Sequence, residues 1–183
     1  MPFIFEKTFI DGLLIITPRL FTDERGFFLE SYKSSEFAAA GIREAFVQDN
    51  HSRSIRGVLR GLHFQKAPYA QAKLVRVTRG LVWDVAVDLR HGSPTFGRWL
   101  GVELGEENRK MLFLPRGFAH GFVALSEGAE LIYKCSAEYD KDSDGGVRWD
   151  DPDLGIEWPL SAVKLSEKDA ALPFLRDIAG ELS

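Results

Sequence analysis

Apolar and polar residues alternate along most of this chain, in short segments separated by turn-forming residues. Side chains of a β-strand point to opposite faces in turn, so this alternation predicts strands rather than helices. We expect strands in the segments 12–20, 26–32, 57–64, 72–80, 81–90, 98–104, 110–115, 121–125 and 131–139. Gly, Pro, Asp and Asn residues between them favour turns, and the whole pattern predicts an all-β sandwich or barrel.

Only two segments favour helices, and both are short. Residues 33–41 predict a helix that is capped by a serine and ends at Gly41, and residues 166–172 predict another near the end of the chain. We find no internal repeat and no linker in the sequence. A length of 183 residues suits a single domain over residues 1–183, built from strands with a few short helices.

The composition is that of a soluble globular protein, with 45% hydrophobic and 27% charged residues. The net charge of −4 gives the molecule as a whole no electrostatic attraction for nucleic acid. Glu6, Lys7 and Asp11 interrupt the apolar N-terminal stretch, which argues against a signal peptide, and no segment is long and apolar enough to span a membrane. The single cysteine, Cys135, excludes an internal disulfide, so we expect a cytoplasmic protein.

Two of the predicted strands carry polar side chains on one face. The segment LVWDVAVDLR places its large apolar side chains on one face, which we assign to the core, and Asp84 and Asp88 on the other. On an ordinary exposed strand these carboxylates would be solvated, so their role stays open. The segment LIYKCSAEY places Tyr133 and Tyr139 on one face above small residues, which favours either a ligand cavity or two packed tyrosines with satisfied hydroxyls.

The segment GVLRGLHFQ contains one candidate base, His63, three residues after Arg60. Strict alternation would place these two side chains on opposite faces, so a common cavity requires an irregular strand. Gly61 lies between them, where a bulge or kink has little steric cost. Two interpretations remain open: an imidazole that acts as a base beside cations, or a hydrogen-bonded structural histidine.

A metal or nucleotide cofactor has little support in the sequence. The four histidines His51, His63, His91 and His120 include no close His-x-His pair, and one cysteine cannot form a cluster, so we expect no metal. The chain also lacks the glycine-rich loops that hold phosphates at a helix N-terminus. Side chains, above all arginines, would have to hold the phosphates of any nucleotide.

A series of long motifs covers nearly the whole chain: TDERGFFLESY, QDNHSRSIRGVLRGLHFQ, QAKLVRVTRGLVWDVAVDLRHGSPTFGRW, LPRGFAHGF, YKCSAEY, VRWDDPDLGIEWP and SEKDAALP. In order and spacing they resemble the dTDP-4-dehydrorhamnose 3,5-epimerase family. The resemblance implies a cupin-like β-sandwich or jelly-roll barrel that is cytoplasmic, metal-independent and usually homodimeric. It also implies a substrate, dTDP-4-dehydro-6-deoxy-D-glucose, on the route to dTDP-L-rhamnose.

The same resemblance implies roles for a catalytic group of residues. Inverting a carbon next to a ketone requires a base, a stabiliser for the enolate and an acid on the opposite face. His63 matches the base, and Asp169 matches the carboxylate that pairs with it. Tyr133 matches the acid, and Lys73 matches a residue near the C4 oxygen, where positive charge stabilises the enolate.

Further residues match the family's substrate-binding positions. Arg60 suits the diphosphate because arginine donates through a fork, and Tyr139 matches an aromatic residue that stacks on thymine. Asp144 stands where many relatives carry glutamate, which leaves its contact open. The residues that match the nucleotide and sugar pocket are Arg25, Glu30, Gln48, Asn50, Arg60, His120 and Lys168.

Two alternative functions share these motifs. One is an epimerase that inverts only C3 or only C5 of a related dTDP-4-ketosugar. The other is a non-catalytic cupin-like module that binds a nucleotide sugar or a partner protein. The presence of His63, Asp169 and Tyr133 together argues against the second alternative, because a pure binder needs neither a base nor an acid.

Overall fold

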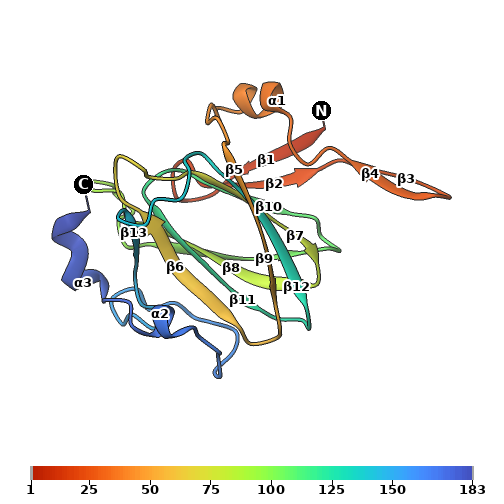
Figure 1. Ribbon diagram of the computed structural model, residues 1–183. Coiled ribbons are helices and arrows are strands. Elements are labelled where there is room, and N and C mark those ends of the chain that lie inside the picture. Colours follow the sequence, from red (N-terminus) through yellow and green to blue (C-terminus); the bar gives the residue numbers. More distant parts are fainter. Residues whose placement is uncertain (1, 183) are drawn as a thin grey trace.

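The chain folds into two antiparallel β-sheets that face each other as a sandwich, in a computed structural model that describes residues 2–182 (Figure 1). The predicted all-β class is therefore confirmed. The strands of the larger sheet, in spatial order, are β1 (Phe3–Lys7), β2 (Leu14–Pro18), β10 (Met111–Leu114), β7 (Lys73–Arg79), β12 (Ala129–Cys135) and β5 (Gln48–Ser54).

The second sheet has five strands, and neighbouring strands in both sheets pair antiparallel. In spatial order they are β13 (Asp144–Gly146), β6 (Leu59–Gln65), β11 (Phe118–Ala124), β8 (Leu81–Asp88) and β9 (Trp99–Gly105). β6 and β12, the strands that carry His63 and Tyr133, thus belong to different sheets. A ligand between the sheets has these two side chains on opposite sides.

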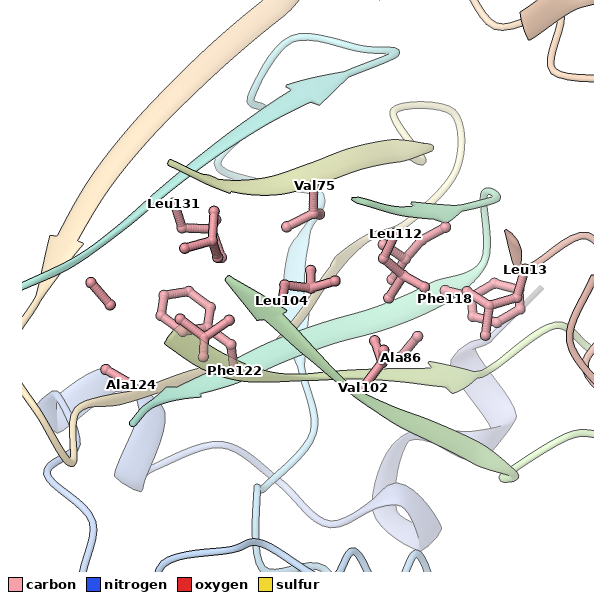
Figure 2. Close-up of a cluster of buried hydrophobic side chains, with 14 of the residues drawn as sticks. Leu13, Val75, Ala86, Val102, Leu104, Leu112, Phe118, Phe122, Ala124 and Leu131 are labelled. Atoms are coloured by element: carbon pink, nitrogen blue, oxygen red, sulfur yellow. The ribbon is translucent and has the colours of Figure 1, made fainter. Parts of the chain in front are cut away.

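The main hydrophobic core fills the space between the sheets. Val75 and Leu131 come from the larger sheet, whereas Ala86, Leu104 and Phe122 come from the smaller one, and all five are buried in one cluster (Figure 2). The period of two separates the two faces of each strand, but it did not show which face of the segment 81–90 lies between the sheets. The face that carries Ala86 and the carboxylates lies there, and not the face of large apolar side chains that the sequence analysis assigned to the core. Burial of this apolar surface is the main favourable term that holds the two sheets together.

Each sheet is also covered on its outer face, which the sequence did not predict. On the smaller sheet, Val85 and Val87 pack with residues of the C-terminal segment such as Leu154 and Leu175. On the larger sheet, β1, β2 and β10 pack against Phe37 of helix α1 (Ser34–Ala39). Strand β8 is therefore buried on both faces, rather than on one as its alternation indicated.

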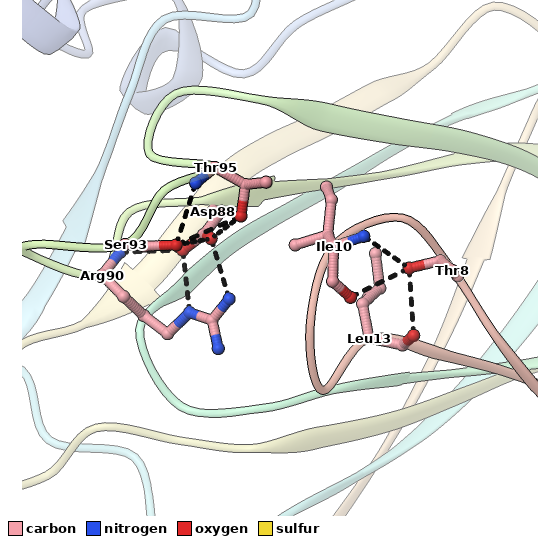
Figure 3. A network of polar contacts seen from close by, with 7 residues as sticks. All are labelled: Thr8, Ile10, Leu13, Asp88, Arg90, Ser93 and Thr95. Carbon is pink, nitrogen blue, oxygen red and sulfur yellow. Dashed lines mark hydrogen bonds and ion pairs between the residues drawn. The ribbon is translucent and has the colours of Figure 1, made fainter.

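Burial of both faces of β8 also settles the environment of its two carboxylates. Asp84 and Asp88 are fully buried rather than solvated. A buried carboxylate requires hydrogen-bond donors. Asp88 receives them from Arg90, Ser93 and Thr95 in the following turn (Figure 3), and Asp84 receives them from a histidine described below.

A separate two-stranded hairpin, β3 (Leu20–Asp23) and β4 (Gly26–Leu29), extends away from the sandwich (Figure 1). Glu24 and Arg25 join these strands, within the turn-forming residues that separate the predicted strands 12–20 and 26–32. Phe27 and Phe28 are 62% and 65% exposed, which is unusual for two adjacent large apolar side chains. The hairpin thus presents apolar surface to a partner or to solvent.

The helices are short, as expected, but their details differ from the prediction. α1 begins without a side-chain cap, because Lys33 and not a serine is its N-cap residue. The predicted second helix is α2 (Glu167–Ala170), which Ser166 does cap. A third helix, α3 (Leu175–Ile178), and a 3-10 turn over Ala179–Glu181 were not predicted. None of the helices within residues 2–182 is long and apolar enough to cross a membrane.

Candidate active site

A cavity of about 260 Å³ opens between the two sheets. The smaller sheet contributes side chains of β6 and β11, the larger sheet contributes side chains of β5, β7 and β12, and α2 closes one side. The residues that line the cavity are Ser52, Arg60, His63, Lys73, His120, Phe122, Tyr133, Ser166, Lys168 and Asp169. All four residues predicted to be catalytic are among them.

An irregularity in β6 brings Arg60 and His63 to the same cavity. The register between β6 and β11 shifts between His120 and Phe122, and His120 then lies opposite His63. Gly61 has a φ of +123°, and a Cβ atom there would lie 2.5 Å from the Cα atom of Gly121. Only glycine fits this close approach of two backbones, so the predicted irregularity at Gly61 is confirmed.

His63 and Asp169 form a close pair. The Nε2 atom of His63 lies 2.5 Å from Oδ1 of Asp169, whose carboxylate is buried. Burial alone would raise the pKa of Asp169, but its hydrogen bond and electrostatic interaction with His63, the Ser166 hydroxyl and Lys168 outweigh it and hold the pKa below its usual value. An ionised carboxylate only accepts, so Nε2 donates the hydrogen bond and Nδ1 keeps the lone pair of a base.

A second histidine–carboxylate pair lies next to the first. The Nε2 atom of His120 lies 2.9 and 3.0 Å from the two carboxylate oxygens of Asp84, and both side chains are buried. Asp84 was not among the predicted site residues. It orients the His120 ring, which lines the cavity beside His63. The signal that pointed to Asp84 was a carboxylate inside an apolar strand.

Lys73 places a positive charge inside the cavity. Its side chain is only 8% exposed, and its ammonium makes no hydrogen bond or ion pair with any other residue between 2 and 182. Burial lowers the pKa of Lys73, and electrostatic interactions with Cys135, Asp144 and Asp84 offset part of this effect. An unpaired buried cation binds an anion or a developing negative charge strongly.

Tyr133 faces the cavity from the larger sheet. Its ring packs against the main core, and its position on β12 lies opposite Asn50 of β5. Burial is the main cause that raises the pKa of Tyr133; Cys135 adds to this effect and Arg60 opposes it. The phenol is therefore protonated near neutral pH and can donate a proton or a hydrogen bond.

A chain of polar contacts, which we call the rim, connects several predicted binding residues to Lys168 at the cavity or to one another. Gln48 accepts a hydrogen bond from the backbone of Tyr139 at 2.8 Å, and its amide donates to Asn50 at 3.1 Å. The Tyr139 hydroxyl donates to Asp144 at 3.2 Å, and Lys168 forms an ion pair with the same carboxylate. Asp144, whose contact the sequence left open, therefore joins two predicted binding residues, and the structure brings all five together.

Gln48 begins β5, and Arg60 is held at the other end of this strand, by Ser54. Its Nε atom donates to the hydroxyl of Ser54 at 3.1 Å, and Nη2 donates to the carbonyl of Arg53 at 3.5 Å. These bonds leave further guanidinium donors for a ligand.

Sequence reasoning missed β5 because the segment is polar. Its alternation of half-buried and exposed residues, with Asn50, Ser52 and Ser54 inward, was the available signal.

Two predicted binding residues do not reach the cavity of their own chain. Arg25 lies at the tip of the β3–β4 hairpin, is 85% exposed and forms an ion pair with Asp23. Glu30 follows β4 at the base of the same hairpin. The hairpin pairs only with itself, so it holds both residues away from the cavity.

The family model for dTDP-4-dehydrorhamnose 3,5-epimerase matches residues 7–177. The chain is 55% identical to the enzyme of that name from Salmonella typhimurium over 92% of this chain and 93% of the relative. It is 53% identical to the one from Methanothermobacter thermautotrophicus over 96% of each chain.

Solved structures share the fold closely. The dTDP-6-deoxy-D-glucose-3,5-epimerase of Legionella pneumophila, in complex with dTDP-4-keto-L-rhamnose, matches with a TM-score of 0.95 and 50% identity over 98% of this chain and 96% of that one. A 3'-monoepimerase of Streptomyces bikiniensis in complex with dTDP-quinovose matches with a TM-score of 0.89 and 36% identity, over 95% and 89%. The sandwich is thus the cupin-like fold that the motifs predicted, and the chain belongs to the dTDP-4-dehydrorhamnose 3,5-epimerase family.

Proposed function

We propose that this protein inverts C3 and C5 of dTDP-4-dehydro-6-deoxy-D-glucose to give dTDP-4-dehydro-L-rhamnose. The observation that carries the proposal is the placement of a base and an acid on different sheets. His63, paired with Asp169, faces the cavity from β6, and Tyr133 faces it from β12. A sugar held between the sheets is therefore deprotonated on one face and reprotonated on the other.

The chemistry at each carbon follows from the ketone at C4. The ketone acidifies the protons on C3 and C5, and Nδ1 of His63 removes one of them to give an enolate. Asp169 stabilises the imidazolium that forms. Tyr133 then donates its phenolic proton to the opposite face of the carbon. The His63 imidazolium afterwards releases its extra proton to solvent, and the Tyr133 phenolate takes one up, which returns both side chains to their starting states.

Lys73 stabilises the enolate. The reaction converts a neutral ketone oxygen into one with negative charge, and the buried ammonium favours the charged form far more than the ketone. Because this charge does the work of a Lewis acid, we propose that no metal is required. Turnover should survive exhaustive treatment with EDTA, whereas loss of turnover that one divalent ion restores would contradict this proposal.

The rim and Arg60 bind the rest of the substrate. Arg60 and Lys168 supply positive charge for the diphosphate, and the exposed Tyr139 ring offers a stacking face for thymine. Gln48 and Asp144 hold Tyr139 from both sides through its backbone and hydroxyl. This arrangement gives the nucleotide a fixed position from which the sugar reaches His63.

We also propose a cytoplasmic homodimer in which residues 1–183 form one domain. The exposed Phe27 and Phe28 need a partner surface, and Arg25 and Glu30 need a cavity that their own chain does not offer. A second copy that receives the hairpin supplies both. Cys135, which is buried and forms no disulfide, fits a reducing compartment.

Subunit complementation tests the dimer. Arg25→Ala and His63→Asn variants should each be nearly inactive alone. Mixed and reassembled, half of the dimers would contain one intact site, which restores about a quarter of wild-type activity. No recovery in a mixture that sedimentation shows to be dimeric would contradict the shared site.

Incubation with the ketosugar in heavy water tests the function itself. We expect deuterium at both C3 and C5 by NMR, together with the inverted product, because each inversion passes through an enolate that solvent-derived protons quench. Deuterium at one carbon alone would show a mono-epimerase. Binding of dTDP without deuterium at either carbon would show a non-catalytic module.

A further inference from the structure

One polar atom in the cavity has no function in the proposal above. The hydroxyl oxygen of Ser52 is buried and has no hydrogen-bond partner in the structure. Ser52 lines the same cavity as His63, Lys73 and Tyr133. A buried hydroxyl without a hydrogen-bond partner is unfavourable, so native proteins keep one mainly where a bound ligand supplies the missing hydrogen bond.

The position of Ser52 on β5 explains why the protein itself does not satisfy this hydroxyl. The inward residues of β5 are Gln48, Asn50, Ser52 and Ser54, and the other three each bond within the protein. Opposite Ser52 on β12 stands Leu131, which has no polar side-chain atom. Ser52 is thus the one inward side chain of this strand whose hydrogen bond is left for the cavity.

Its neighbours place Ser52 beside the sugar rather than at the thymine end. Asn50, two residues before it, lies opposite the proposed acid Tyr133. Ser54, two residues after it, holds Arg60, the proposed diphosphate residue. Ser52 therefore lies between the acid and Arg60 and faces the part of the cavity that is proposed to hold the sugar.

We propose that the Ser52 hydroxyl binds the 2-hydroxyl group of the ketohexose and positions the ring for both inversions. This inference rests on the proposed function. The reaction inverts C3 and C5, C4 is the ketone and C6 is a methyl group, so the 2-hydroxyl is the one ring hydroxyl whose carbon keeps its configuration throughout. An anchor on this group holds the ring while His63 reaches each of the two carbons.

Ser52→Ala, assayed with the natural ketosugar and with its 2-deoxy analogue, tests the assignment. For wild-type enzyme, we expect kcat/KM to fall roughly tenfold on removal of the 2-hydroxyl, the effect of one hydrogen bond. Ser52→Ala should lose a similar factor with the natural substrate and lose nothing further with the 2-deoxy analogue, since the two changes remove the same contact. Equal losses from Ser52→Ala with both substrates would overturn the assignment.

Two further measurements separate this role from others. The affinity for dTDP, which lacks the sugar, should be unchanged in Ser52→Ala but reduced in the matched variant Ser54→Ala, which frees Arg60. Weaker dTDP binding by Ser52→Ala would instead assign Ser52 to the diphosphate and overturn the proposal.

The melting temperature of the ligand-free protein provides the second measurement. It should stay the same or rise in Ser52→Ala, because an unsatisfied buried hydroxyl is removed. A lower melting temperature with a matching loss of activity would show a structural role and also overturn the proposal. If wild-type enzyme shows no deuterium exchange with the natural substrate, the proposed function itself fails, which is a different outcome from any of these.

Discussion

Replacing Asp88 by asparagine should destabilise the protein in a way that depends on pH. The Asp88 carboxylate is fully buried at the end of β8, and it accepts hydrogen bonds from Arg90 at 2.8 and 2.9 Å (Figure 3). The hydroxyls of Ser93 and Thr95 donate to it at 2.6 and 2.7 Å. Burial alone would raise the pKa of Asp88, but these donors together lower it to about 2.

The pKa shift sets the size of the effect. A fall in the Asp88 pKa from 3.8 to about 2 means that folding favours the ionised carboxylate by on the order of 2 kcal/mol, at about 1.4 kcal/mol for each unit. Because the pKa is lower in the folded state, this stabilisation is complete well above pH 3.8 and is lost as the pH falls toward 2. About 1 kcal/mol of it should remain at pH 3.

Urea unfolding of wild type and Asp88→Asn at pH 7 and pH 3 measures this difference. The loss of unfolding free energy should be about 2 kcal/mol at pH 7 and about 1 kcal/mol at pH 3. Asp150→Asn is the matched control, since Asp150 forms the same forked pair with Arg148 but is 39% exposed, and it should cost less than about 1 kcal/mol. An equal loss for Asp88→Asn at both pH values would refute the reasoning.

The remaining predictions concern the cavity. Lys73→Met should lower kcat roughly 10²-fold or more, because it removes the charge at the enolate, and a change below about threefold in steady-state assays would place Lys73 elsewhere. His63→Asn should abolish deuterium exchange measured by NMR but keep dTDP affinity, whereas equal loss of both would make His63 structural. Asp169→Asn should be milder and should add little to His63→Asn in the same assay, since the pair acts as a unit. Tyr133→Phe should reduce inversion by roughly 10² to 10⁴ and raise the ratio of deuterium incorporated to product formed. A parallel loss of exchange and inversion would mean that Tyr133 is needed to form the enolate.

Local pattern determined much of the fold. Strand β12 alternates with a period of two because one of its faces packs into the core between the sheets. In β8 the alternation separates the face with the carboxylates, which lies between the sheets, from the apolar face that the C-terminal segment covers. The need for an irregular strand at Gly61 also followed from the sequence, since Arg60 and His63 cannot otherwise share a cavity. The catalytic residues came from the resemblance, and the structure gathers His63, Lys73, Tyr133 and Asp169 in one cavity.

Tertiary structure decided which groups surround each polar side chain. Alternation showed that Asp84 differs from its neighbours, but only the packing of β11 against β8 brings His120 to it. The same limit applies to β5, whose inward residues look like those of a solvated edge until the second sheet encloses them. The period of two assigns a side chain to a face, and the chain folded around that face determines whether it meets water, core or substrate.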